Sequence, residues 1–210
     1  MSRASQFGDR AVLISCDDRA ERLAVRSRLI AEAPGWSIRE GICSLLVVAE
    51  RPDARMLAAV DEVLDEAAPP TTPDEGMTSA VTIAVVYDGA DLDETAEVLG
   101  LSKSGLVRAH TAQSWVVDVM GFAPGFGYLI PIEEETAPWS SANRRASPRE
   151  QVPAGSVAVA AGMSAVYPAA MPGGWNLLGR TSAVMFDVAD ESAPSLLAPG
   201  ARVRFVEQVE

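Results

Sequence analysis

Three arginines within six positions form a concentrated patch of positive charge in an otherwise acidic chain. Arg144, Arg145 and Arg149 lie in "NRRASPREQVPAGSV", whereas the whole chain has a formal net charge of -12. Guanidinium groups bind carboxylates and phosphates through paired N–H donors, and the backbone N–H groups of Gly155 and Ser156 can add to such a site. The segment therefore predicts an acidic-ligand site, against the alternative of solvated charges paired with the three glutamates that precede it.

The segment "GFAPGFGYL", residues 121–129, gathers aromatic rings around turn-forming backbone. Gly125 permits a tight turn, and Phe122, Phe126 and Tyr128 offer flat apolar faces for a ligand. In the alternative interpretation these rings complete the core and bind nothing. We expect partial exposure of Phe126 and Tyr128 in the first case and complete burial in the second.

Two further features are candidates for a site. Gly173 and Gly174 precede Trp175 in "AAMPGGWNLLGRT" and allow close approach of a ligand or of another strand. His110 is the only histidine and therefore the only side chain with an ordinary pKa near neutrality, which makes it a candidate for proton transfer or, alternatively, a structural hydrogen-bonding group. We take His110 and Arg149 as the catalytic candidates.

The sequence lacks the motifs of several common enzyme and binding-protein classes. The sequence contains no phosphate-binding P-loop, no dinucleotide-binding G-x-G-x-x-G after a strand, no H-E-x-x-H and no G-x-S-x-G. With a single histidine, and with Cys16 and Cys43 far apart, no metal site is predicted, and both thiols are expected to be free and buried. The acidity argues against nucleic-acid binding.

No apolar stretch is long enough to cross a membrane, and the polar start "MSRASQFGDR" lacks the core of a signal peptide. These features predict a cytoplasmic protein that does not bind membranes.

Hydrophobic periodicity predicts two domains. The first, residues 1–78, has a strand at 11–15, a helix after it, two strands around Gly41 and a helix capped by Asp53, an order that makes up most of a ferredoxin-like α+β unit. The Pro- and Thr-rich stretch 68–80 is expected to be a linker.

In the second domain, residues 79–210, a strand at 81–89 leads to a short helix opened by Asp91 and a second helix that begins at Ser102. Short strand-like runs follow, separated by Gly- and Pro-rich loops, and predict a β-barrel or sandwich. These runs are "WVVDVM", "GSVAVA", "SAVYP", "AVMFDV" and "ARVRFV".

The ordered motifs of residues 81–205 resemble those of the 5-oxoprolinase B-subunit family, also called the Kip-inhibitor or allophanate hydrolase subunit 1-like family. They include "YDGADL", "HT", "GFAPGFGYL", "SPREQVPAGSVAVA", "PGGWNLLGRT" and "LLAPGARVRF". At 163–165 the chain has Met, Ser and Ala where that family usually has Gln, Thr and Gly.

The resemblance implies a ferredoxin-like N-terminal part followed by a cyclophilin-like β-barrel. It implies a C subunit as heterodimer partner, and with an A subunit the conversion of 5-oxoproline to glutamate at the expense of ATP, with ATP and Mg²⁺ needed by the complex and not held tightly by this chain. In such a complex the arginines would bind a carboxylate or phosphate and His110 would move a proton. The alternatives are a regulator that inhibits a sensor histidine kinase and a subunit of an allophanate or urea amidolyase-like enzyme.

Overall fold

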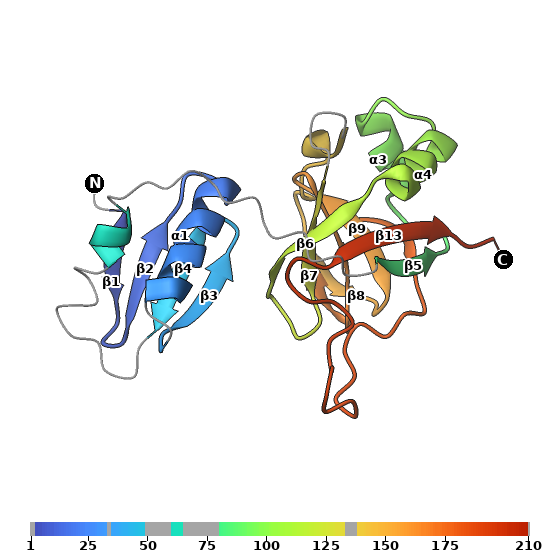
Figure 1. The fold of residues 1–210 in the computed structure, drawn as a ribbon. Helices are drawn as coiled ribbons and strands as arrows, with labels where there is room; N and C mark the ends of the chain where they lie inside the picture. The colour runs from blue at the N-terminus through green and yellow to red at the C-terminus, as the bar shows by residue number, and fades with distance from the viewer. Residues whose placement is uncertain (1–2, 33–34, 49–59, 65–79, 133–137, 210) are drawn as a thin grey trace. The chain divides into compact units, whose positions relative to one another are not determined.

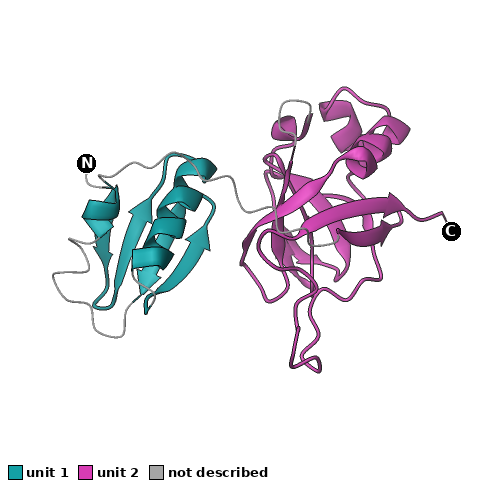
Figure 2. Ribbon diagram, in the orientation of Figure 1, with its two compact units in different colours: residues 1–77 teal, residues 78–210 magenta. Residues whose placement is uncertain are grey.

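The computed structural model describes residues 3–32, 35–48, 60–64, 80–132 and 138–209, and the chain divides into two compact units, 1–77 and 78–210 (Figures 1 and 2). Nearly all of the predicted linker 68–80, the predicted boundary between residues 78 and 79, and the start of the helix expected at Asp53 lie outside the described residues.

Unit 1 contains a four-stranded antiparallel sheet in the order β1-β2-β4-β3. The predicted strands and first helix are confirmed, whereas β1 was not predicted because "ASQF" has only one large apolar residue. The elements are β1 (Ala4–Phe7), β2 (Ala11–Ser15), α1 (Arg19–Glu32), β3 (Ser37–Gly41) and β4 (Ser44–Val48).

The core of unit 1 lies between this sheet and its helical segments. Ile14, Leu29 and Leu45 are almost completely buried in it, together with Val60 and Val63 of the helical residues 60–64. Burying apolar side chains on one face of a sheet against a helix is the main stabilising term for such a layer.

The two thiols of unit 1 are both free, as predicted, but only one is buried. Cys16 follows β2 and points into the core, where burial raises the pKa of its thiol. Cys43 lies in the turn between β3 and β4 and is exposed, so the expectation that both are buried is wrong for Cys43.

Unit 2 is built on a seven-stranded sheet in the order β12-β9-β10-β7-β6-β13-β5. The two edge strands, β12 and β5, come together where Arg180 and Val86 exchange two backbone hydrogen bonds of 2.9 Å. The sheet is therefore nearly closed into a barrel. Its strands are β5 (Val81–Val85), β6 (Trp115–Met120), β7 (Gly127–Pro131), β9 (Ser156–Ala160), β10 (Met163–Val166), β12 (Asn176–Arg180) and β13 (Arg202–Glu207).

The helices of unit 2 lie over one part of the barrel (Figure 1). They are α3 (Leu92–Val98), α4 (Lys103–Ala112) and the short 3-10 helix η2 (Pro138–Ser141). The predicted start of α4 is confirmed, because the side chain of Ser102 accepts a hydrogen bond of 3.1 Å from the backbone N–H of Gly105.

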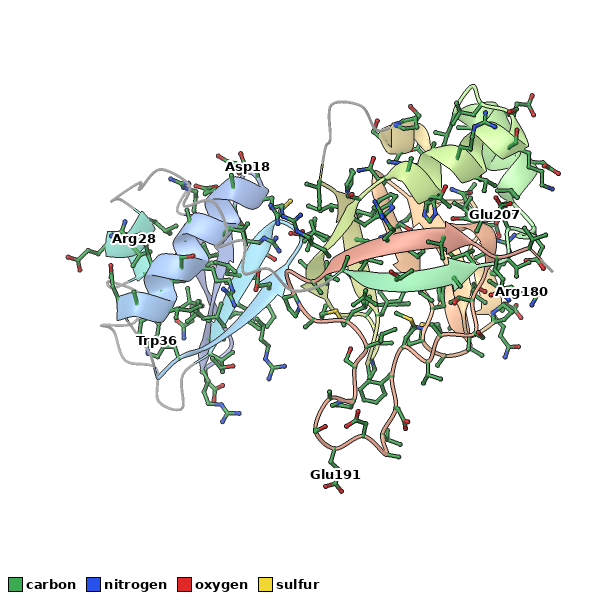
Figure 3. All side chains as sticks on the ribbon, turned by 45° about the vertical axis from the view of Figure 1, so that its right-hand side comes forward. Asp18, Arg28, Trp36, Arg180, Glu191 and Glu207 are labelled. Atoms are coloured by element: carbon green, nitrogen blue, oxygen red, sulfur yellow. The ribbon has the colours of Figure 1, made fainter. Side chains whose placement is uncertain are left out.

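The predicted strand pattern of unit 2 is only partly right. The run 183–188 forms no strand and has one isolated bridge, between Phe186 and Ser195. It belongs to a long connection that extends away from the barrel, with Glu191 near its far end (Figure 3). The small sheet of β8 (Arg149–Val152) and β11 (Met171–Gly173) falls in predicted loops.

No helix in the described ranges is long and apolar enough to span a bilayer.

Candidate functional site

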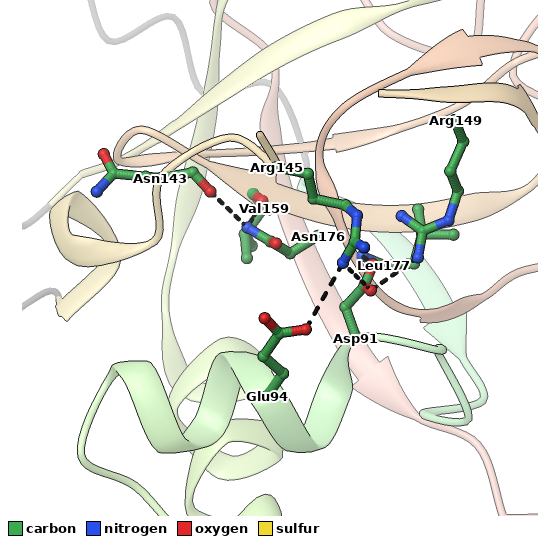
Figure 4. A network of polar contacts seen from close by, with 8 residues as sticks. All are labelled: Asp91, Glu94, Asn143, Arg145, Arg149, Val159, Asn176 and Leu177. Atoms are coloured by element: carbon green, nitrogen blue, oxygen red, sulfur yellow. Dashed lines mark hydrogen bonds and ion pairs between the residues drawn. The ribbon is translucent and has the colours of Figure 1, made fainter. Parts of the chain in front are cut away.

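A buried carboxylate organises the arginine segment. Asp91 is only 2% exposed, and its Oδ1 accepts from Arg145 Nη1 at 2.6 Å and from Arg149 Nη2 at 2.7 Å (Figure 4). Its Oδ2 accepts from the backbone N–H of Leu177 at 2.8 Å. Charge-assisted donors on both oxygens compensate the cost of burying the carboxylate. We call Asp91, Arg145 and Arg149 the Asp91 cluster.

Local backbone packing places Asp91 against β12. A Cβ on Gly89 would collide with the carbonyl of Leu177, so only glycine permits this approach. The backbone N–H of Asp91 donates to the carbonyl of Leu177 at 3.1 Å. Asp91 immediately precedes α3, as predicted, but its side chain makes no capping hydrogen bond; the expectation of a cap is corrected because the arginines take the carboxylate.

The two guanidinium groups of the Asp91 cluster are not fully satisfied by the described residues. Arg145 Nε and Arg149 Nη1 are buried without a hydrogen-bond partner there, and the further ion pair of Arg145 with exposed Glu94 is 3.6 Å long. Pairing with glutamates 133–135 lies outside the described residues. Two positive charges thus share one buried negative charge, which leaves capacity for another anion.

The aromatic segment 121–129 and the Gly173-Gly174 turn line one cavity of about 260 Å³, which we call the aromatic cavity. It brings together five predicted substrate-binding residues, namely Phe126, Tyr128, Arg144, Gly173 and Gly174. The other lining residues are Phe122, Pro148, Tyr167, Pro172 and Trp175. Neither Arg145 nor Arg149 lines this cavity.

The ring of Phe126 contacts most of the other rings around the aromatic cavity. Its ring centroid lies 5.3 Å from Phe122, 5.1 Å from Tyr128 and 5.5 Å from Tyr167, in edge-to-face arrangements. Phe126 is 2% exposed, as the core interpretation predicts, whereas Tyr128 is half-buried, as the binding interpretation predicts. Phe126 supports the cavity wall from within the core.

The exposed ring of this segment is Phe122, which was predicted to offer a flat apolar face but was not placed among the site residues. It is 64% exposed and has a φ of 72°, a left-handed conformation that is unfavourable for a bulky side chain. Gly125 also has a positive φ, and a Cβ there would lie 2.7 Å from Phe186 Cβ. The turn therefore holds Phe122 outward at the edge of the cavity.

A second and more polar cavity, of about 450 Å³, lies beside the Asp91 cluster. Arg144 lines both cavities, and Arg145 lines this one only. We call it the polar cavity; its remaining lining residues are Glu94, Thr95, Val98, Ser141, Ala142, Asn143, Ala146, Ser147 and Asn176.

Gly155 and Ser156 do not contribute to an anion site in this structure. The backbone N–H of Gly155 donates to the carbonyl of Tyr167 at 2.7 Å, and that of Ser156 donates to the carbonyl of Pro153. A Cβ on Gly155 would collide with the carbonyl of Thr181. The predicted binding role of both residues is corrected to a turn that closes tightly against Thr181.

His110 lies in the core of unit 2 and not in either cavity. It is 0% exposed, stacks on Phe205 at 4.4 Å between ring centroids, and meets Trp139 edge to face. Its Nδ1 lies 2.8 Å from the hydroxyl of Tyr87, and its Nε2 lies 3.0 Å from Ser164 Oγ.

These hydrogen bonds define the state of the imidazole. Ser164 Oγ donates to the carbonyl of Ala158 at 3.2 Å, so it accepts from Nε2–H of His110, and Nδ1 accepts from Tyr87. Burial lowers the pKa of His110 from 6.5 to about 3. Because it is neutral, sealed and paired on both nitrogens, the catalytic prediction for His110 is corrected to a structural role.

Within the described residues, no group of three or more His, Cys, Asp or Glu side chains comes together that could hold a metal ion.

Asp91 and Thr95 were missed as members of the site, and Phe122 was named for its apolar ring but not placed among the site residues. Asp91 follows the turn pair Asp88-Gly89, where an aspartate is expected at a helix start, so local pattern favoured a cap. Its arginine partners are 54 and 58 residues away. Neither the burial of Asp91 nor the lack of space for a side chain at Gly89 can be recognised from the local sequence.

The comparisons agree on one family and fold. A family model described as carboxyltransferase domain, subdomain C and D, matches residues 2–197. The 5-oxoprolinase B subunit of Escherichia coli O157:H7 is 37% identical over 199 residues, which are 91% of this chain and 84% of that protein. The protein of the same name from Bacillus subtilis (strain 168) is 41% identical over 129 residues, 60% of this chain and 52% of the relative.

Two solved structures have a similar fold. The crystal structure of TTHA0988 is 31% identical with a TM-score of 0.72, and the match covers 96% of this chain and 40% of that one. The Kluyveromyces lactis urea carboxylase has a TM-score of 0.73 at 15% identity, over 98% of this chain and 22% of that one, a likeness of fold alone. This chain therefore spans less than half of either solved protein.

Proposed function

The chain belongs to the family of carboxyltransferase subdomains C and D, and we propose that it is the B subunit of an ATP-dependent 5-oxoprolinase. The observation that carries the proposal is the aromatic cavity, in which Arg144 lies together with aromatic rings from three separate segments of the chain. The relatives named as 5-oxoprolinase B subunits, at 37% and 41% identity, support the same reaction.

The aromatic cavity suits a small cyclic amino acid with one carboxylate. The apolar ring edge of 5-oxoproline would pack on Tyr128 and Trp175, and Arg144 would bind the carboxylate through its paired N–H donors. A Cβ on Gly173 would collide with the hydroxyl of Tyr167, so only glycine at this position lets Tyr167 keep its place in the cavity wall. In this role the chain binds and orients the lactam.

Hydrolysis of the lactam needs more than this chain. Its carbonyl is a weak electrophile, and transfer of a phosphoryl group from ATP to the carbonyl oxygen would create a leaving group for attack by water. The sequence has no P-loop, so we assign the nucleotide and Mg²⁺ to the assembled complex of A, B and C subunits. The complex would work in the cytoplasm, where ATP is available.

The exposed ring of Phe122 supports a C subunit that completes the aromatic cavity. An exposed aromatic at the edge of a binding cavity is typical of residues desolvated on association. We also assign unit 2 to the cyclophilin-like barrels, and unit 1 to a variant of the ferredoxin-like units in which β1 adds an edge strand.

The test is glutamate release from 5-oxoproline, with ATP and Mg²⁺, by the chain purified with its A and C subunits. We expect no turnover by the chain alone. Arg144→Ala should raise the KM for 5-oxoproline at least tenfold, whereas Arg108→Ala, on the exposed face of α4, should leave it unchanged.

Two results would contradict the proposal. Turnover by the isolated chain would show that no partner is needed. Absence of turnover by the assembled complex, combined with inhibition of a sensor histidine kinase by the chain, would favour the regulatory alternative.

A further inference from the structure

The polar cavity is lined by a residue whose buried hydroxyl group has no protein partner among the described residues. Thr95 on α3 is 3% exposed and lines this cavity, and its Oγ1 makes no hydrogen bond within that part of the chain. A buried polar atom left unsatisfied costs about 1–3 kcal/mol, and such atoms are rare in folded proteins. The hydroxyl therefore indicates that something polar completes the cavity.

A second residue that lines the same cavity also has a buried donor without a partner. Arg145 uses Nη1 for Asp91 and Glu94, while its Nε is buried without a partner in the described part of the chain. The Nε–H group of arginine can only donate, and the hydroxyl of Thr95 can donate as well. Both groups can therefore donate to an acceptor.

The charge of the surroundings favours an acceptor that is negative. Arg144 and Arg145 line the polar cavity and Arg149 adjoins it through Asp91, whereas the acidic side chains there are Asp91 and Glu94. When the aromatic cavity is empty, these three arginines and two carboxylates leave one positive charge over locally, although the chain as a whole has a net charge of -12. Partly buried guanidinium groups bind oxyanions more strongly than solvated ones do.

The wall of the polar cavity is held in place before any ligand binds. Asn176 Nδ2 donates to the carbonyl of Asn143 at 2.8 Å and to that of Val159 at 3.2 Å (Figure 4). The backbone N–H of Arg145 donates to the carbonyl of Gly174 at 2.8 Å. These bonds tie the loop that carries the arginines to β9, β12 and the Gly173-Gly174 turn, so little ordering is needed on binding.

We propose that the polar cavity is a second binding site, which takes the carboxylate or phosphate group of a small molecule between Thr95 and Arg145. It is separate from the aromatic cavity, because Arg144 is the one lining residue that the two cavities share. The site does not depend on the 5-oxoprolinase assignment, because the unsatisfied donors belong to this chain alone.

The test measures binding of inorganic phosphate and of acetate to the full chain by calorimetry and by the ligand-dependent rise in Tm. Binding of phosphate alone identifies a phosphate site, and binding of acetate alone identifies a carboxylate site. Binding of neither at millimolar concentration to the folded chain would overturn the proposal.

Thr95→Val gives the sharper measurement because it should weaken anion binding without lowering the stability of the chain. It removes an unsatisfied buried hydroxyl at almost constant volume, so Tm without ligand should stay equal or rise, while the Kd for the bound anion should increase about tenfold. Thr95→Ser keeps the hydroxyl and should keep the affinity. Thr82→Val on the exposed face of β5 is the matched control and should change neither quantity.

Unchanged affinity in folded Thr95→Val would overturn the assignment of Thr95 to the site. If Thr95→Val does not fold, Thr95→Ala removes the same hydroxyl and is measured in its place. Tyr128→Ala, which alters only the aromatic cavity, should leave phosphate or acetate binding intact; loss of binding in that variant would contradict two separate sites.

Discussion

His110 and Asp91 are both almost completely buried in unit 2, yet their surroundings differ in what they leave unpaired. The imidazole is neutral, and both of its nitrogens have protein partners within the aromatic core. The carboxylate of Asp91 is paired by two arginines whose remaining donors are incompletely used by the described residues. A fully satisfied polar group stabilises a core, whereas a partly satisfied charged cluster can also bind a ligand.

Asp91→Ala should have the largest effect. It leaves two partly buried guanidinium groups and the Leu177 N–H without their acceptor, so we expect the free energy of unfolding to fall by about 3–5 kcal/mol in denaturant titration. The control is Asp93→Ala, two positions away, whose side chain is 79% exposed. A similar small change in both variants would show that the Asp91 cluster does not stabilise unit 2.

Arg149→Ala should have an intermediate effect. Arg149 forms an ion pair with buried Asp91 and therefore contributes to folding. Asp91 keeps Arg145 and the Leu177 N–H, so the loss should be about 1.5–3 kcal/mol, the range for a hydrogen bond to a charged group. Exposed Arg108→Ala should change stability by less than about 0.5 kcal/mol. An equal loss in the two variants would argue against the pairing.

The sealed state of His110 predicts a pH dependence of stability. The unfolded chain binds a proton near pH 6.5 and the folded chain only near pH 3, so the unfolded state holds the extra proton between these values. Stability should therefore fall by about 1.4 kcal/mol per pH unit as pH decreases below 6.5, or about 2 kcal/mol by pH 5. His110→Phe should lose this part of the slope; identical slopes would show that the imidazole is accessible.

Phe122→Ala should have the smallest effect on folding. The ring is 64% exposed, so the free energy of unfolding should change by less than about 0.5 kcal/mol, in contrast to about 3–5 kcal/mol for buried Phe126→Ala. Binding of the C subunit should instead weaken by about 2 kcal/mol if Phe122 is an interface residue. Normal binding by Phe122→Ala would place the interface elsewhere.

The sequence predicted those elements whose signals are local. The valine-rich run "WVVDVM" and the cap at Ser102 were sufficient for β6 and α4. β7 and β12 were taken as parts of loops, because Gly and Pro at their ends favour turns and tertiary pairing overrides that preference. The family resemblance is confirmed by relatives of the same name.

Prediction of the site from sequence was less complete. Phe126, Tyr128, Arg144, Gly173 and Gly174 were named from the turn chemistry, aromatic content and charge of their segments, and the structure places all five around one cavity; their role in binding stays a prediction. The structural role of His110 depends on the rings that surround it, and three of these, Tyr87, Trp139 and Phe205, come from segments distant in the sequence.

The place of β13 in the barrel has a consequence for synthesis on the ribosome. All four strands of unit 1 lie within residues 4–48, so its sheet can form early in translation. In unit 2, β13 (Arg202–Glu207) lies between β5 and β6, and β5 pairs with it in parallel (Figure 1). The edges of β5 and β6 stay open until residues 202–207 have emerged, and during that interval the nascent chain is most prone to aggregation and most in need of a chaperone.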